Sequence, residues 1–285
     1  MCVRVHDLLE CTLFPTLSAA PVLAEEGASG APSLPSVEDF FPPYIIGTAN
    51  DWWAIDRVMF IRLIIAALLI LFLWLATRKA KVIPGRAQSI VEMGLDFVRV
   101  QIAEQTLGKE RSKPYVGMLT VIFFTILAMN LAGVIPFLNL AGTSRMGLPL
   151  LLALWVFVTY LVVGVRKQGV GGYLKSQLVP SGVPWWMMPL IGLIEALTVF
   201  VIRPATLALR LVANMMAGHV MLVLCFVGTH TLFLYADAPM KPLGVLTLAG
   251  GVAITLFEVF VAALQAFIFT LLSAVYINFS LEESH

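Results

Sequence analysis

Polar and charged residues lie inside the two longest apolar stretches of this 285-residue chain, about 186–229 and 242–279. They are Glu195, Arg203, Arg210, Asn214, His219, Glu258 and Gln265. An ionised side chain at the centre of a membrane costs about 2.5–3.5 kcal/mol on insertion scales. Structural pairing is an ordinary explanation for any one of these residues. So many in one region indicate an ion pathway or a buried polar network.

Their spacing predicts polar stripes on two helices. At about 100° per residue, Arg203, Arg210 and Asn214 fall within about 40° of one another on the first helix. Glu258 and Gln265 are seven residues apart and share a face of the second helix.

An antiparallel pairing of the two stretches would place these residues at three levels. A hairpin closed near Asp237 sets Arg210 level with about Gln265, and His219 level with about Glu258. We therefore expect His219 and Glu258 towards the outer side and Arg210, Asn214 and Gln265 in the middle. Glu195 would lie near the inner surface.

This layout suits proton transfer. Imidazole titrates near neutrality and a desolvated carboxylate can approach it, so His219 and Glu258 can hand protons on. Arginine stays protonated and cannot take part. Arg210 would instead interrupt a continuous proton path and attract a carboxylate. Since no second carboxylate lies at its level in this chain, we expect that group on another subunit.

Composition identifies an integral membrane protein. Hydrophobic residues make up 60% of the chain and charged residues only 12%, with a mean hydropathy of +0.93. Soluble domains carry roughly 25% charged residues. The net charge of +1 gives no basic surface for nucleic acid. The cysteines, Cys2, Cys11 and Cys225, have no metal-binding spacing, and no Gly-rich phosphate loop is present.

Hydrophobic runs predict the elements that position these residues. We expect spans at about Val58–Ala76, Tyr115–Ile135 and Leu148–Val165. Between the first two, Gln88–Leu107 is periodic but charged, which favours an amphipathic helix in the membrane interface.

The run from Trp186 to Thr229 is about twice the length of one perpendicular span. It could cross twice with a break at Arg203-Pro204, or form one strongly tilted helix. Pro204 alone offers no polar turn, so we favour a long tilted hairpin with the last run. The predicted fold is an all-α polytopic membrane protein with five membrane-crossing helices and one interfacial amphipathic helix.

Residues 1–50 differ from the membrane domain at 51–285, being rich in Pro, Ser, Ala and Gly. A cleaved signal peptide is one interpretation of this segment, and a poorly ordered extracytoplasmic arm is the one we favour. Basic residues concentrate in the loops after the first and third spans. The positive-inside rule then places the N-terminus outside and the C-terminus in the cytoplasm.

The ten residues from Arg210 to His219 read Arg-Leu-Val-Ala-Asn-Met-Met-Ala-Gly-His. This string closely resembles the signature of subunit a of the rotary F-type ATP synthase. Asn130 to Phe137 looks like a second motif of that family, and Glu258 and Gln265 match a third at their spacing. The resemblance covers about 58–279.

The resemblance implies a stator channel beside a rotating ring of c subunits, with peripheral-stalk b subunits as further partners. Arg210 would face the ring carboxylate and block a leak between two offset half-channels. His219 and Glu258, with Asn130, would line the outer half-channel, and Glu195 would serve the inner one. Asn214 and Gln265 would support Arg210. The family implies a multi-pass protein, in a bacterial plasma membrane rather than a mitochondrial inner membrane.

Three other classes fit less well. A secondary transporter commonly shows internal repeats, and none is visible between the halves of this chain. A passive anchor gives no reason for Arg, His and Glu within lipid. An enzyme acting alone lacks a phosphate loop or metal cluster, so we expect no cofactor. A Na⁺-translocating version of the same subunit stays open, because the ring site decides the ion.

Overall fold

The structure, a computed structural model, describes residues 44–46, 55–78, 85–134, 146–178, 187–234 and 238–281. These residues belong to one compact unit of the chain, Leu34–His285. The arm predicted at 1–50 lies outside the described residues except for the strand β1 (Tyr44–Ile46). This strand pairs antiparallel with β2 (Ile55–Asp56), a short ladder that the sequence did not suggest.

The all-α membrane fold predicted from the sequence is confirmed. The apolar helices are α1 (Arg57–Thr77), α4 (Val116–Val134), α5 (Gly147–Leu178), α6 (Met188–Leu197), α7 (Arg203–Leu234) and α8 (Lys241–Leu281). Helix α6 continues into α7 through a π-helical segment, η4 (Thr198–Ile202). Within the described ranges, four spans are long and apolar enough to cross a membrane, and α1 adds the shorter apolar stretch Met59–Leu75.

The predicted amphipathic helix is present as three consecutive segments. They are α2 (Arg86–Asp96), the π-helical η3 (Phe97–Glu104) and α3 (Gln105–Leu107). Val98 and Ile102 are fully buried against the other helices, whereas Ile90 and Met93 are exposed. The segment therefore packs by one face and leaves a second apolar face open, as expected of a helix lying in an interface.

Helices α7 and α8 form the long hairpin, closed by the short 3₁₀ segment η5 (Ala238–Met240). The Thr229 hydroxyl lies 3.0 Å from that of Thr247, and further along Asn214 faces Gln265. The predicted hairpin register agrees with these pairs. The 41 residues of α8 extend about 60 Å. That is about twice the hydrocarbon thickness of a bilayer, so the helix tilts strongly or projects beyond it.

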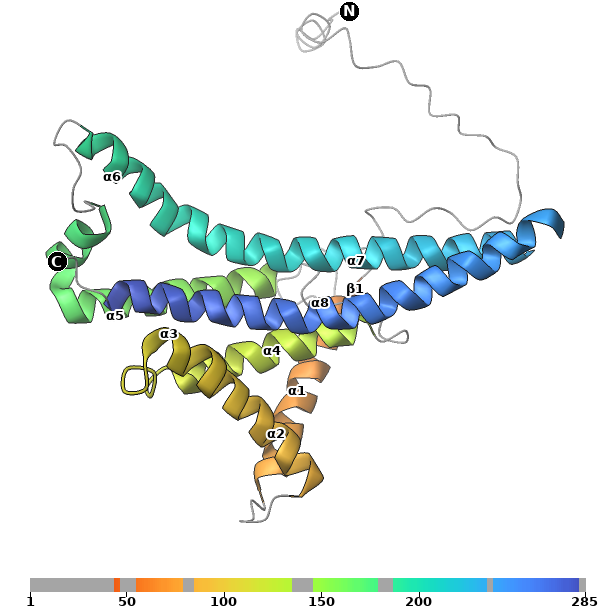
Figure 1. Cartoon of the computed structure of the whole chain (residues 1–285), viewed down its shortest axis with the longest axis horizontal. Helices are drawn as coiled ribbons and strands as arrows, with labels where there is room; N and C mark the ends of the chain where they lie inside the picture. The colour runs from red at the N-terminus through yellow and green to blue at the C-terminus, as the bar shows by residue number, and fades with distance from the viewer. Residues whose placement is uncertain are drawn as a thin grey trace, which may run out of the picture. The chain divides into compact units, whose positions relative to one another are not determined.

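The core surrounds one half of the hairpin. The C-terminal half of α8 packs against α4, α5 and α7 (Figure 1). It does so through small buried residues such as Ala262, Ala266 and Ala274. Small residues let helix backbones approach closely, which is how membrane helices gain packing contacts. In the other half of α8, large apolar side chains such as Val252, Leu256 and Phe260 are exposed.

Helix α5 runs further than the predicted end near Val165 and turns at Gly169. Gly169 has a φ of +74°, a left-handed conformation that favours glycine. Beyond this turn, the Tyr173 ring folds back onto Gly164. Lys167 and Gln168 donate hydrogen bonds to the carbonyls of Leu281 and Ser280. These carbonyls belong to the last turn of α8, where a helix leaves its acceptors unpaired, so α5 caps α8.

Candidate functional site

Arg210 lies on an uncovered face of α7. Arg210, Ala213, Asn214 and Ala217 are all exposed along one side of the helix, whereas Leu211 is fully buried on the other. The Arg210 guanidinium makes no hydrogen bond, ion pair or ring contact with any other residue in the described part of the chain. A cation in this position is available to an anion carried by a partner.

Beside Arg210, the two hairpin helices are joined by an amide pair. Asn214 Nδ2 donates a 2.9 Å hydrogen bond to Gln265 Oε1. Gln265 is buried, and its Nε2 has no hydrogen-bond partner among the described residues. A buried donor left unpaired is costly, so this amide is well placed to donate to a group that arrives next to Arg210.

Glu258 packs against Gly218, the residue before His219. A methyl group added at Gly218 would lie 3.1 Å from Glu258 Cδ and closer still to Oε1. Glu258 is half-buried, and its buried Oε1 has no hydrogen-bond partner within the described residues. A methyl group at residue 218 would therefore push the Glu258 carboxylate aside. The contact between Gly218 and Glu258 was not predicted, although Gly218 lies inside the motif. A glycine within a helical sequence does not indicate which side chain packs against it.

If the chain takes part in ATP-driven proton pumping, as the resemblance implies, Gly218→Ala should slow that pumping several-fold, because the added methyl group displaces the Glu258 carboxylate. The measurement is acidification of inverted membrane vesicles per assembled complex. Gly228→Ala is the matched control, since nothing lies within 4 Å of a methyl group at that position of the same helix. Equal rates for the two variants would contradict the contact with Glu258.

Glu195 and Arg203 form an ion pair across the π-helical segment. Arg203 Nη2 lies 3.9 Å from Glu195 Oε1, and the guanidinium stacks on the rings of Tyr276 (5.4 Å) and Phe279 (5.8 Å). From the sequence alone, Arg203 could contact lipid headgroups or the ring edge, or it could have a structural role. The contacts within the chain favour the structural role. The ion pair of Glu195 with Arg203 was not predicted.

Asn130 is completely buried on α4. It continues the stripe of Leu119, Phe123 and Ile126, residues of the core that α4 shares with α8. The structure therefore places Asn130 in the packed interior of the bundle, next to the helix that carries Glu258 and Gln265.

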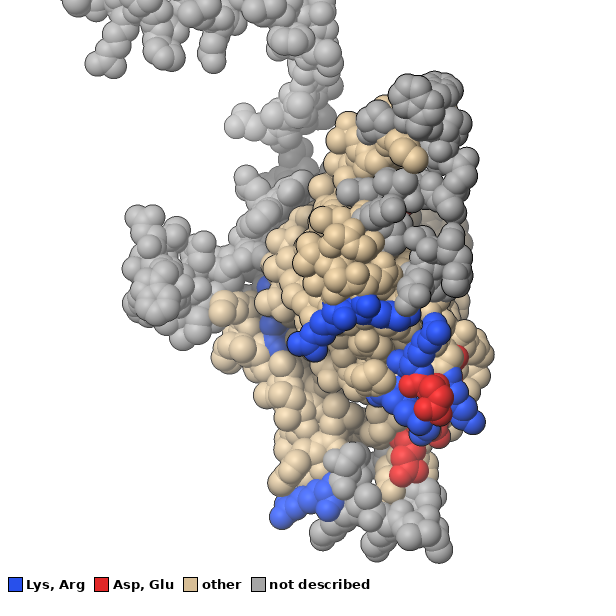
Figure 2. Space-filling view, turned by 90° about the vertical axis from the view of Figure 1, so that its left-hand side faces the viewer, with Lys and Arg blue, Asp and Glu red and all other residues tan. Residues whose placement is uncertain are grey.

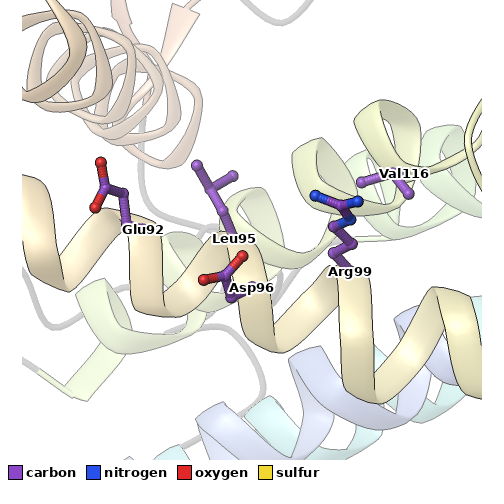
Figure 3. Close-up of a pocket in the computed structure, with 5 residues that line it drawn as sticks. All are labelled: Glu92, Leu95, Asp96, Arg99 and Val116. Carbon is purple, nitrogen blue, oxygen red and sulfur yellow. The ribbon is translucent and has the colours of Figure 1, made fainter. Parts of the chain in front are cut away.

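Charged side chains gather at the end of the molecule where α8 finishes. Figure 2 faces that end and shows Lys and Arg with a few acidic residues among them. The exposed basic residues in the α3–α4 connection and in α5 are Lys109, Arg111, Lys113, Arg166 and Lys167. A separate polar pocket lies on the amphipathic segment, lined by Glu92, Leu95, Asp96, Arg99 and Val116 (Figure 3). Arg99 there forms an ion pair with Glu104 at 3.1 Å, and the lining residues come from α2, η3 and α4 rather than from the described residues of the hairpin.

Comparison with known proteins gives a consistent picture. The family model described as "ATP synthase A chain" matches residues 59–278. A protein of Rhodococcus erythropolis named "ATP synthase subunit a" is 41% identical over 266 residues, covering 93% of this chain and 94% of its own. Proteins of the same name from Frankia alni and a Nocardioides species are 35% and 34% identical, over 90% and 95% of this chain and 88% and 100% of their own.

Proposed function

Because this chain belongs to the ATP synthase A chain family, we propose that it conducts protons through two offset half-channels beside a rotating ring of carboxylate-bearing c subunits. Membership of the family places it in the membrane sector of an F-type ATP synthase, as a non-catalytic, multi-pass subunit that takes part in ion translocation.

The main support for the proposal is the environment of the Arg210 side chain. Its guanidinium is exposed on the uncovered face of the hairpin and has no anionic partner among the described residues. The neighbouring Ala213 and Ala217 are small and exposed, so a second helix can approach closely. A carboxylate on that helix would pair with Arg210 and release its proton there. Loss of proton pumping in Arg210→Ala is the direct test.

We assign the two half-channels to the other polar groups. His219 and Glu258 line the outer half-channel, with Asn130 behind them, and Glu195 serves the inner one. The amide groups of Asn214 and Gln265 provide a polar environment beside Arg210. The fixed positive charge of Arg210 separates the two paths. Histidine and carboxylate side chains exchange protons, which supports H⁺ over Na⁺ as the ion.

Orientation and further partners belong to the same proposal. The exposed basic residues near the end of α8 support a cytoplasmic C-terminus and an outer N-terminus, with residues 1–50 as an extracytoplasmic arm. Peripheral-stalk b subunits are the further partners. Nucleotide chemistry takes place on other subunits.

The ring interface can be tested by disulfide formation. The experiment starts from a chain in which Cys2, Cys11 and Cys225 are changed to serine. Ala213→Cys is introduced into this chain, and a second cysteine is introduced beside the carboxylate of the ring subunit. We expect a disulfide on mild oxidation of membranes, because residue 213 is exposed beside Arg210. Ala208→Cys, fully buried on the same helix, is the control and should not react. A disulfide from residue 208 but not from 213 would place the ring on another face.

A further inference from the structure

The π-helical segment η4 leaves one buried carbonyl without a donor from its own helix. The Arg203 N–H bonds the Thr198 carbonyl, five residues back. The next bond of that pattern would run from residue 204 to the Val199 carbonyl, but Pro204 has no N–H. Val199 is fully buried. A buried carbonyl without a donor destabilises the segment, so this turn needs a donor from elsewhere.

Tyr160 of α5 provides that donor. Its hydroxyl donates a 2.7 Å hydrogen bond to the Val199 carbonyl. The side chain is 1% exposed, and its ring packs edge-on against Phe157 (5.4 Å) and Tyr276 (6.1 Å). The hydroxyl is therefore fixed in place and takes over the bond that Pro204 cannot make.

The wide turn determines where Glu195 points. Residues eight apart on a regular α-helix are offset by about 80° around its axis. Glu195 and Arg203 are eight apart, yet their side chains meet at 3.9 Å. A π turn holds more residues than an α turn, and this reduces the offset. The helix also bends between α6 and α7 (Figure 1), as π segments and prolines commonly cause.

We propose that Tyr160 is a positioning residue for Glu195. By bonding the Val199 carbonyl, its hydroxyl stabilises the π turn that sets Glu195 beside Arg203. The inference rests on the proposed function, in which Glu195 exchanges protons on the inner side. Pro204 creates the need for the bond and Tyr160 meets it, so the two residues act as a pair.

The test is a rescue experiment. Tyr160→Phe keeps the ring and removes only the hydroxyl, and we expect ATP-driven pumping per assembled complex to fall roughly fivefold. The dependence of the pumping rate on cytoplasmic pH should also differ from that of the wild type, because Glu195 and Arg203 no longer lie side by side. Adding Pro204→Ala restores a backbone N–H at residue 204. The double variant should regain both the rate and the pH profile of the wild type.

Tyr115→Phe is the matched control, because it removes the hydroxyl of a tyrosine just before α4, and its rate and pH profile should match the wild type. A normal rate and profile in Tyr160→Phe would overturn the inference, and so would a double variant no better than Tyr160→Phe. If Tyr160→Phe fails to assemble, recovery of assembly by Pro204→Ala supports the pairing, and no recovery overturns it. Glu195→Gln tests the proposed role of Glu195 separately: normal pumping in that variant contradicts the half-channel itself.

Discussion

Replacing Arg210 with alanine should reduce ATP-driven proton pumping to background while the complex still assembles. The side chain is exposed and makes no contact with the described residues that holds the fold together, so its removal leaves the hairpin packing intact. What is lost is the positive charge on the uncovered face of α7 beside Ala213 and Asn214. Without it, a ring carboxylate keeps its proton as it passes.

The measurements are acidification of inverted vesicles, the amount of assembled complex, and passive proton conductance after the catalytic sector is removed. Conductance should rise, because the fixed charge that separates the half-channels is gone. Arg111→Ala is the matched control, an exposed arginine in the α3–α4 connection, and should pump normally. Coupled pumping retained in Arg210→Ala would refute the proposed function.

The hairpin and its polar residues could be predicted from the sequence because polar residues are rare in membrane-spanning segments. An arginine in an apolar helix stands out by its cost, and a period of 3.6 residues shows which side chains share a face. Since one short loop joins two long helices, residue numbers alone set the register. Asn214 and Gln265 accordingly face each other in the structure.

The details that the sequence did not predict depend on single contacts between distant segments. Nothing near Tyr160 indicates that its hydroxyl bonds Val199, 39 residues away. Periodicity also cannot show that α6 and α7 meet in a π turn, because the apolar run passes through it unbroken. Gly169 ends one regular helix inside α5 through its positive φ. The basic residues before it indicated the end of the membrane span, but not that the chain turns there and continues as a helix.

Replacing Glu258 with glutamine should slow ATP-driven pumping by about tenfold or more, since positioned proton-transfer groups contribute roughly 10²–10⁴-fold. Glutamine has the same size and fits beside Gly218, but its amide cannot take up and release a proton. Assembly should be unchanged. The Oε1 atom of Glu258 has no hydrogen-bond partner among the described residues, so no internal bond is broken.

The side of the membrane on which the step fails distinguishes this variant from one at Glu195. In inverted vesicles the outer half-channel opens to the lumen, so Glu258→Gln should alter the response to luminal pH and leave the response to external pH unchanged. Glu195→Gln should do the reverse. Glu110→Gln is the control, an exposed carboxylate that pairs only with Lys113 in the described chain. If Glu258→Gln and His219→Ala both pumped at the normal rate, the outer path would have to lie along residues other than these two.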